Sequence, residues 1–307
     1  MKPSRYVREV YLDPDQNNQR VRQNILNAGI YAQLQTKLFT GFELMAGLRL
    51  DNATYFNKGN FSQLVYDELG LRTDNGLSTF QIQPRVQITW DFNDKHTDIL
   101  RIGGGIFASD INNYAMINNM VFDGTKVMSV DIKNTEEEPD IVPTPDFIGY
   151  RKDPSTAPGI DLLNNPKYAD KAVPTINMNS KDAKVPVVYK ANISYTHFFS
   201  DRLKMSVSGY MTLGRNNYMY IDRNMVDDPY FRLSAEGNRG IYVPASTIGK
   251  DGTLDWMEGR KSTKVGRVLE LVSEGKVNQF AFTVDGTWRY YKDGELSFSY
   301  TWNDTKD

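Results

Sequence analysis

The feature that most constrains this chain is a series of long segments in which apolar and polar residues alternate. In an extended strand successive side chains point to opposite faces, so a two-residue period predicts strands with one apolar face and one polar face. The pattern starts near residue 25. Its first apolar set is Leu26, Ala28, Ile30, Ala32 and Leu34, and the opposite set is Asn27, Gly29, Tyr31, Gln33 and Gln35.

The alternating segments come in pairs that are separated by short polar turns. Two such runs joined by a tight turn predict an antiparallel hairpin. The sequence therefore predicts a series of hairpins with about eight strands in all. They cover residues 25–35 with 42–51, residues 80–92 with a strand from 99, residues 187–195 with 203–211, and residues 280–290 with 296–302.

The predicted strands are long for a soluble protein. Segments of about 10 to 14 residues exceed the usual strand of about 5 to 6 residues. Ten residues tilted near 40° rise about 25 Å, the height of the lipid-facing band of an outer-membrane barrel. Phe80 and Trp90 lie ten residues apart on one apolar face. This spacing predicts one aromatic ring at each membrane interface.

The connections between the predicted strands alternate in length. Turns of a few residues alternate with longer segments near residues 56–79, 110–185 and 223–265. Bacterial outer-membrane barrels have short periplasmic turns and long extracellular loops. The predicted fold class is therefore all-β, with antiparallel transmembrane β-barrel strands and long extracellular loops.

Composition excludes several other classes of protein. The chain is 40% hydrophobic with a mean hydropathy of −0.52, and no apolar stretch approaches the roughly 20 residues of a spanning helix. Its 36 basic and 38 acidic residues are mixed along the chain, which gives no electrostatic footprint for nucleic acid. Cysteine is absent, and we find no credible catalytic motif, metal-ligand spacing or cofactor fingerprint. We expect no enzyme activity, no metal and no cofactor.

Several stretches of the predicted strands occur in an order that resembles one family. These are Ala28 to Gln33, Ala46 to Asp51, Gln83 to Val86 and Arg101 to Phe107. Together they resemble the barrel of TonB-dependent outer-membrane receptors. Residues 268–275 and the ending at residues 299–307 are similar to the subgroup that carries a carboxypeptidase-regulatory-like N-terminal domain.

The resemblance implies energised uptake of a nutrient across the bacterial outer membrane. A family member has a signal peptide, a plug domain, a segment that binds TonB and a barrel of about 22 strands. The residues from Met1 to Tyr6 lack the apolar core of a secretory signal, so we interpret residues 1–307 as part of a barrel, without plug domain or signal peptide. The resemblance implies membrane lipid, TonB and a plug as partners, and it allows a surface lipoprotein. The substrate, whether siderophore, glycan, peptide or vitamin, is open.

Two groups of residues are candidates for function. The first group lies on the polar faces of the strands, where it would hydrogen-bond a plug and line the passage. The second group lies where strands reach the predicted outer rim, where it could contact a ligand or serve solubility. The polar-face group is Gln33, Gln35, Glu43, Arg49, Gln83, Arg85 and Arg289, and the rim group is Asn112, Asn113, Tyr114, Tyr220 and Arg223.

Four alternatives remain open at this point. A soluble β-sandwich or propeller would pack its apolar faces against each other, and a soluble glycan-binding protein would do the same. A complete barrel of eight strands is also a size that occurs. In that case the last strand should end near a lipid-facing aromatic residue, whereas residues 303–307 are polar and predict the start of an outer loop. A passive or adhesive barrel would use the same strands without a plug.

Overall fold

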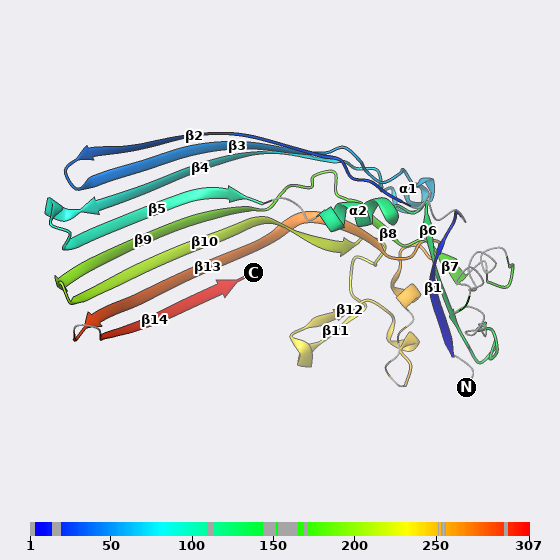
Figure 1. The fold of residues 1–307 in the computed structure, drawn as a ribbon. Coiled ribbons are helices and arrows are strands. Elements are labelled where there is room, and N and C mark those ends of the chain that lie inside the picture. Colours follow the sequence, from blue (N-terminus) through cyan, green and yellow to red (C-terminus); the bar gives the residue numbers. More distant parts are fainter. Residues whose placement is uncertain are drawn as a thin grey trace.

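A computed structural model describes residues 4–13, 20–109, 113–143, 152, 165–168, 171–250, 252, 254, 256–291 and 294–307. One curved antiparallel sheet dominates it (Figure 1). Eight long strands follow one another around the sheet, each beside its neighbour in the chain. They are β2 (Ile25–Phe39), β3 (Phe42–Tyr55), β4 (Leu77–Asp91), β5 (Asp98–Ala108), β9 (Val187–Ser200), β10 (Leu203–Asp222), β13 (Val268–Arg289) and β14 (Glu295–Lys306). The predicted eight antiparallel strands are confirmed.

The register of the strands separates two faces. Side chains of directly paired residues lie on the same face, so a row of partners can be followed across the sheet. One row is apolar or glycine, and the adjacent row is polar from β2 to β14. The apolar row is Leu44, Ile88, Ile102, Ile193, Gly209, Phe282 and Trp302. The polar row is Lys37, Glu43, Thr89, Arg101, Ser194, Ser208, Thr283 and Thr301.

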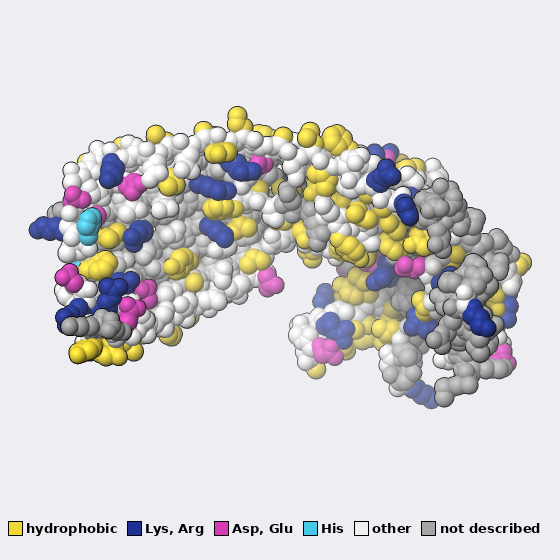
Figure 2. All heavy atoms as spheres, in the orientation of Figure 1, with side chains coloured by type: hydrophobic (Ala, Val, Ile, Leu, Met, Phe, Trp, Pro, Cys, Tyr) yellow, Lys and Arg dark blue, Asp and Glu magenta, His cyan; other side chains and the backbone are white. Residues whose placement is uncertain are grey.

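The apolar face is open to the surroundings. Ile30 is 69% exposed, Ile193 is 51% exposed and Trp302 is 52% exposed. In Figure 2 charged side chains are spread over the face of the sheet that is turned to the viewer, and hydrophobic side chains project along its upper outline. A β-sandwich needs a second sheet over the apolar face, and the exposure of these residues excludes that packing within the described part of the chain.

Short and long connections lie at opposite ends of the strands (Figure 1). The turns at residues 40–41, 92–97, 201–202 and 290–294 share one end, and the connections at residues 56–76, 109–186 and 223–267 share the other. In the tightest turn Gly41 has a φ of +78°, a conformation that favours glycine. The predicted segregation of loop lengths is confirmed. We call the two ends the turn end and the loop end.

Aromatic rings border the apolar face at the turn end. Phe39 stacks on Phe42 with ring centroids 4.6 Å apart, and Phe42 lies 6.2 Å from Trp90. Trp90 lies 4.6 Å from Phe92, which lies 6.3 Å from Tyr195. The rings come from β2, β3, β4, the turn after β4, and β9 on the far side of β5, so the contacts run across the sheet as an aromatic belt at a membrane interface would.

The apolar face gives way to polar side chains beyond Phe80, toward the loop end. Asn52 pairs with Phe80 in the register, and Thr54 pairs with Ser78. The Thr54 hydroxyl lies 3.0 Å from the Asn52 carboxamide oxygen and 3.1 Å from the Ser78 hydroxyl. Phe80 and Trp90 therefore stand at the two limits of an apolar band on β4, as their spacing predicts.

Several strands continue further than the alternation predicts. β10 reaches Asp222, β13 begins at Val268 and β14 ends at Lys306. The prediction that residues 303–307 start an outer loop was wrong, because Asn303 to Lys306 pair with β13. Beyond an apolar band a strand needs no apolar face, so the backbone ladder continues where the sequence pattern has stopped.

The smaller elements gather at the loop end, except for the 3-10 turn at Phe92–Asp94 between β4 and β5. The helices are α1 (Gln63–Leu69), which Ser62 caps and Gly70 ends in a left-handed conformation, and α2 (Asn113–Val121). No helix among the described residues is long and apolar enough to cross a membrane. The short strands are β1 (Arg5–Tyr11), β6 (Val127–Lys133), β7 (Ala172–Val173), β8 (Ile176–Asn179), β11 (Phe231–Leu233) and β12 (Arg239–Ile241), and short 3-10 turns occur at Phe92–Asp94, Ser234–Glu236, Ala245–Thr247 and Trp256–Gly259.

The buried cores also lie at the loop end. One core joins Ala53, Tyr55 and Leu77, from the polar-face positions of β3 and β4, to Met116 of α2 and Leu271 of β13. A second core joins Val65 of α1 to β8 and β13, because β8 pairs in parallel with residues 268–271. A third core joins β1 to β6. We call the long connections at residues 56–76, 109–186 and 223–267 the first, second and third outer connections. Their described residues are packed on the ends of the strands and on each other.

Candidate functional site

All seven polar-face candidates lie where their alternation placed them. Glu43 belongs to the polar row. Gln35 lies two residues from Lys37 and Arg49 lies six residues from Glu43, so both face the same side as that row. Gln33 and Arg85 both pair with Gly47, and Arg289 follows Thr287, which pairs with Lys204 and Ser297. The structure thus gathers on one face residues from β2, β3, β4 and β13, and it leaves their role as plug contacts a proposal.

A carboxylate that the candidate set omits links β3 to β4 and, through Gln83, to β5. Asp51 accepts a hydrogen bond from Arg49 Nε at 2.6 Å and another from Gln83 Nε2 at 2.5 Å, both at Oδ2. Gln83 Oε1 in turn accepts from the backbone N–H of Ala108 at 3.1 Å. Arg49 and Asp51 stand two apart on one strand, so strand periodicity could have found the pair. They line a recess of about 350 Å³ beside Asn27 and Ser109, which offers both donors and acceptors.

The remaining polar-face candidates are also paired or packed. Gln35 Nε2 donates to Glu43, and Arg289 Nε donates to Glu295 at 3.2 Å. Gln33 reaches over Gly47. Three of the charged candidates on the polar face, Glu43, Arg49 and Arg289, therefore already have a hydrogen-bond partner within the sheet.

Neighbouring side chains occupy the space above the glycines of β5. A Cβ on Gly103 would stand 2.7 Å from Asn192 Oδ1, and one on Gly105 would stand 2.9 Å from the backbone oxygen of Pro84. Beside them the guanidinium of Arg85 lies 4.5 Å from the ring centre of Phe107, on whose ring Lys190 also lies at 5.8 Å. The glycines admit these long polar side chains.

The rim candidates separate into two places. Asn112 lies outside the described residues, while Asn113 and Tyr114 open α2. Burial raises the pKa of Tyr220, and the nearby phenols of Tyr218 and of Tyr114, which is 72% exposed, add to the rise. Tyr220 pairs with Leu271, which packs against α2. Sequence reasoning missed Tyr218, although its place two residues before Tyr220 is the signal for a shared face.

Arg223 lies away from the tyrosines, in a groove of about 990 Å³ at the loop end. Its Nε donates to Glu270 Oε2 at 2.5 Å. The groove runs between the end of α1, residues 178–184 and the outer ends of β10 and β13. We call it the outer groove. Charged residues of both signs line it, and they include Glu68, Arg72, Lys181, Lys184, Lys261 and Glu274.

A buried asparagine fixes the loop that carries one wall of the outer groove. Asn224 is fully buried, and its Nδ2 lies within 2.9 Å of the backbone oxygens of Ser262, Val265 and Gly266. Its Oδ1 accepts from the backbone N–H of Ser262 at 2.9 Å. Four hydrogen bonds from one carboxamide therefore hold residues 262–266 against the end of β10.

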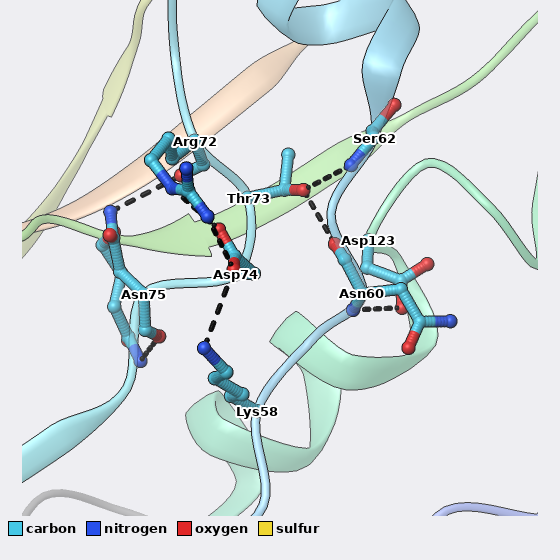
Figure 3. A network of polar contacts seen from close by, with 9 residues as sticks. Lys58, Asn60, Ser62, Arg72, Thr73, Asp74, Asn75 and Asp123 are labelled. Carbon is cyan, nitrogen blue, oxygen red and sulfur yellow. Dashed lines mark hydrogen bonds and ion pairs between the residues drawn. The ribbon is translucent and has the colours of Figure 1, made fainter.

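A buried carboxylate joins the first two outer connections (Figure 3). Asp123 is fully buried; its Oδ2 accepts from the backbone N–H of Asn60 at 2.8 Å. Its Oδ1 accepts from the backbone N–H of Thr125 at 2.9 Å, and Lys126 forms an ion pair with it. Nearby, the Thr73 hydroxyl bridges Asn60 and Ser62. The groove wall at α1 is thereby tied to the connection that carries α2.

Glu68 links α1 to the third outer connection. Lys264 Nζ donates to Glu68 at 2.6 Å and the Ser262 hydroxyl donates to it at 2.8 Å. These two contacts hold the pKa of the Glu68 carboxyl below its ordinary value of 4.5. Because the folded pKa is lowered, the link stabilises the fold above the unfolded pKa and is lost as the pH falls through the folded pKa.

Acidification should therefore loosen the joint between α1 and residues 262–264. We expect hydrogen exchange at residues 262–264 to speed up as the pH falls below about 4.5, after correction for the intrinsic pH dependence of exchange. Glu68→Gln should remove most of this change, while Glu236→Gln, in the β11–β12 hairpin, should keep it. An unchanged pH dependence in Glu68→Gln would show that other carboxylates control the joint.

Among the described residues, no three His, Cys, Asp or Glu side chains are grouped so that they could hold a metal ion. The chemistry that the described sites offer is hydrogen bonding, ion pairing and aromatic contact. These suit binding.

Comparison with solved structures returns transporters and receptors. The chain is similar to the FrpB iron transporter from Neisseria meningitidis (F3-3 variant), with 9% identity and a TM-score of 0.48, over 92% of this chain and 26% of that chain. It is also similar to the outer membrane transporter YddB from Escherichia coli, with 11% identity and a TM-score of 0.49, over 92% and 25%. For the siderophore receptor PirA from Pseudomonas aeruginosa the values are 10%, 0.45, 92% and 34%.

The chain spans about a quarter to a third of the length of these structures. By their names they are two transporters and a siderophore receptor. No protein-family model matches the chain. No curated protein matches it either.

Proposed function

We propose that this chain forms wall and outer loops of a barrel in the bacterial outer membrane that imports a nutrient with energy delivered through TonB. The observation that carries the membrane part is the sheet itself. One face is apolar and open to the surroundings over eight strands, and the other carries a row of polar side chains from β2 to β14. Lipid is the partner that suits such an apolar face.

The orientation follows from the connections. Outer-membrane barrels carry their long loops outside the cell and their short turns in the periplasm. We therefore assign the loop end, with the outer groove, to the cell surface. The aromatic belt around Trp90 then lies at the periplasmic interface.

The edges of the sheet support a barrel of more than eight strands. β2 and β14 are the two ends of the strand order and do not pair with each other. In hydrocarbon no water satisfies the backbone groups of a free edge, so each edge needs another strand. Further strands between β14 and β2 would close the barrel and leave room for a plug against the polar face.

In this arrangement each candidate group has a place. The outer groove and the tyrosines near α2 meet a ligand from outside. The recess around Asp51 faces the interior, where a plug or a passing substrate would find paired donors and acceptors. TonB and the plug enter this proposal by family resemblance. A surface lipoprotein partner and the identity of the nutrient are left to experiment.

Labelling of single cysteines tests the membrane topology. Because these 307 residues contain no cysteine, only the introduced residue can react within them. We expect a membrane-impermeant maleimide to label Tyr230→Cys on intact cells, because Tyr230 is exposed near the β11–β12 hairpin. Tyr291→Cys, in the last turn, should react only after the outer membrane is permeabilised. Ile193→Cys should react only in detergent. Equal labelling of all three on intact cells would contradict the topology.

Import is tested separately, with single-nutrient growth of cells that do or do not contain TonB. A nutrient whose uptake needs both the barrel and TonB supports energised import. Uptake that needs the barrel alone would instead favour the passive barrel, and the labelling result would stand in either case.

A further inference from the structure

A second recess lies at the loop end, apart from the outer groove and the interior face. It has a volume of about 690 Å³. One side is the small sheet of β1, β6 and β7, seen at the right of Figure 1. The other side is formed by Met257, Arg260 and Arg267, which belong to the connection between β10 and β13. Two outer connections that are distant in sequence therefore share this recess.

The recess has an excess of positive charge. The chain as a whole has a formal net charge of −2, so this is a local concentration of cations. Among the described residues, three carboxylates line the recess, on Glu9, Asp131 and Glu138. Twice as many cations line it, namely Arg5, Arg8, Lys133, Lys171, Arg260 and Arg267.

The cations are held in different ways. Arg5 binds Asp131 through two parallel hydrogen bonds of 2.8 and 2.7 Å, which neutralises one of the three carboxylates. The side chain of Arg260 is 8% exposed and forms an ion pair with Asp222 at the end of β10. Arg267 and Lys133 are exposed on opposite sides of the recess. Because Asp222 offsets the charge of Arg260, the accessible positive charge of the recess lies on exposed residues such as Arg267 and Lys133.

We propose that this recess binds a small anionic ligand that carries carboxylate or phosphate groups and bridges the two outer connections. Guanidinium groups bind both kinds of oxyanion through paired donors. An anion placed here would reduce the mutual repulsion of the cations and would hold β6 and residues 257–267 together. The inference does not depend on import, because it concerns capture of a ligand at the loop end alone.

Isothermal titration of the full chain in detergent micelles tests the site, with sodium citrate and inorganic pyrophosphate as the two probes. We expect at least one probe to bind, and added sodium chloride to weaken the binding by screening. Loss of one charged hydrogen-bond partner should weaken it further, so Arg267→Gln should raise the dissociation constant about tenfold. Lys133→Gln should act in the same direction.

Arg232→Gln is the matched control. Arg232 is an exposed arginine of the β11–β12 hairpin that donates to the backbone oxygen of Asn238 and does not line the recess. It should change the dissociation constant less than about twofold. Binding of citrate alone would assign the site to carboxylates, and binding of pyrophosphate alone would assign it to phosphates.

Absence of binding by both probes, or an equal loss in Arg267→Gln and Arg232→Gln, would overturn the proposal. The cysteine-labelling pattern of each variant shows whether the fold is intact. That pattern would be unchanged if only the anion site were wrong, so the two proposals fail separately.

Discussion

Val86→Arg should lower the free energy of unfolding from a lipid bilayer by about 2 to 4 kcal/mol, and so destabilise the barrel. Val86 lies in the middle of β4 and is exposed on the apolar face. An arginine there would place its guanidinium in hydrocarbon, where neither water nor a described neighbour satisfies its donors. The effect should be largest at this depth and smaller near the ends of the band.

Gln87→Arg is the control on the adjacent residue. Gln87 pairs with Gly103 on the polar face, so the same side chain would point into the interior of the barrel. We expect a change within about 0.5 kcal/mol. Urea-dependent folding in phospholipid vesicles, followed by heat-dependent gel mobility, measures both variants. Similar losses in the two variants would contradict the assignment of the faces.

Asp123→Ala should destabilise the loop end by about 3 kcal/mol. The substitution removes the acceptor for the backbone N–H groups of Asn60 and Thr125 and the ionic partner of Lys126. Figure 3 shows Asp123 beside Asn60, and because Asp123 is fully buried, its loss leaves these groups without their acceptor. Asp123→Asn keeps an acceptor oxygen and loses the charge, so its effect should be intermediate.

Hydrogen exchange of residues 56–76 and 113–126 measures this change without requiring global unfolding. Asp227→Ala is the control, because Asp227 forms an exposed ion pair with Lys261, and such pairs contribute about 1 kcal/mol or less. Exchange in the strands near Trp90 should stay unchanged in both variants. If Asp123→Ala speeds exchange no more than Asp227→Ala does, the two outer connections are not joined through Asp123.

The strands were predictable because their pattern repeats. Alternation placed Gln83 and Arg85 on the polar face and Ile82 and Val86 on the other, and the register confirms both sets. The short polar turns predicted the hairpins. The unequal lengths of the connections predicted that the short turns lie together at one end of the strands. These signals are local, since each depends on residues that are close in sequence.

The candidate site was only partly predictable. The sequence pointed to Arg49, Gln83 and Arg223, yet it paired none of them with Asp51 or Glu270. The rim candidates were grouped because strands ended near them, whereas the structure brings Tyr114 to Tyr220 and holds Arg223 in a separate groove. Such partners depend on how the loops fold and on the strand register, and neither produces a periodic pattern in the sequence.

Sequence alone determined that this chain forms long two-faced strands, in hairpin order, with loops at one end. The reason is that side-chain alternation and turn chemistry are fixed by neighbours along the backbone. Only the tertiary structure decided how the outer connections assemble, with β1 on β6, β8 in parallel with β13, and Asp123 and Asn224 as buried joints. Those choices depend on burial and hydrogen bonding between residues far apart in sequence, and each has many alternatives that the local pattern does not distinguish.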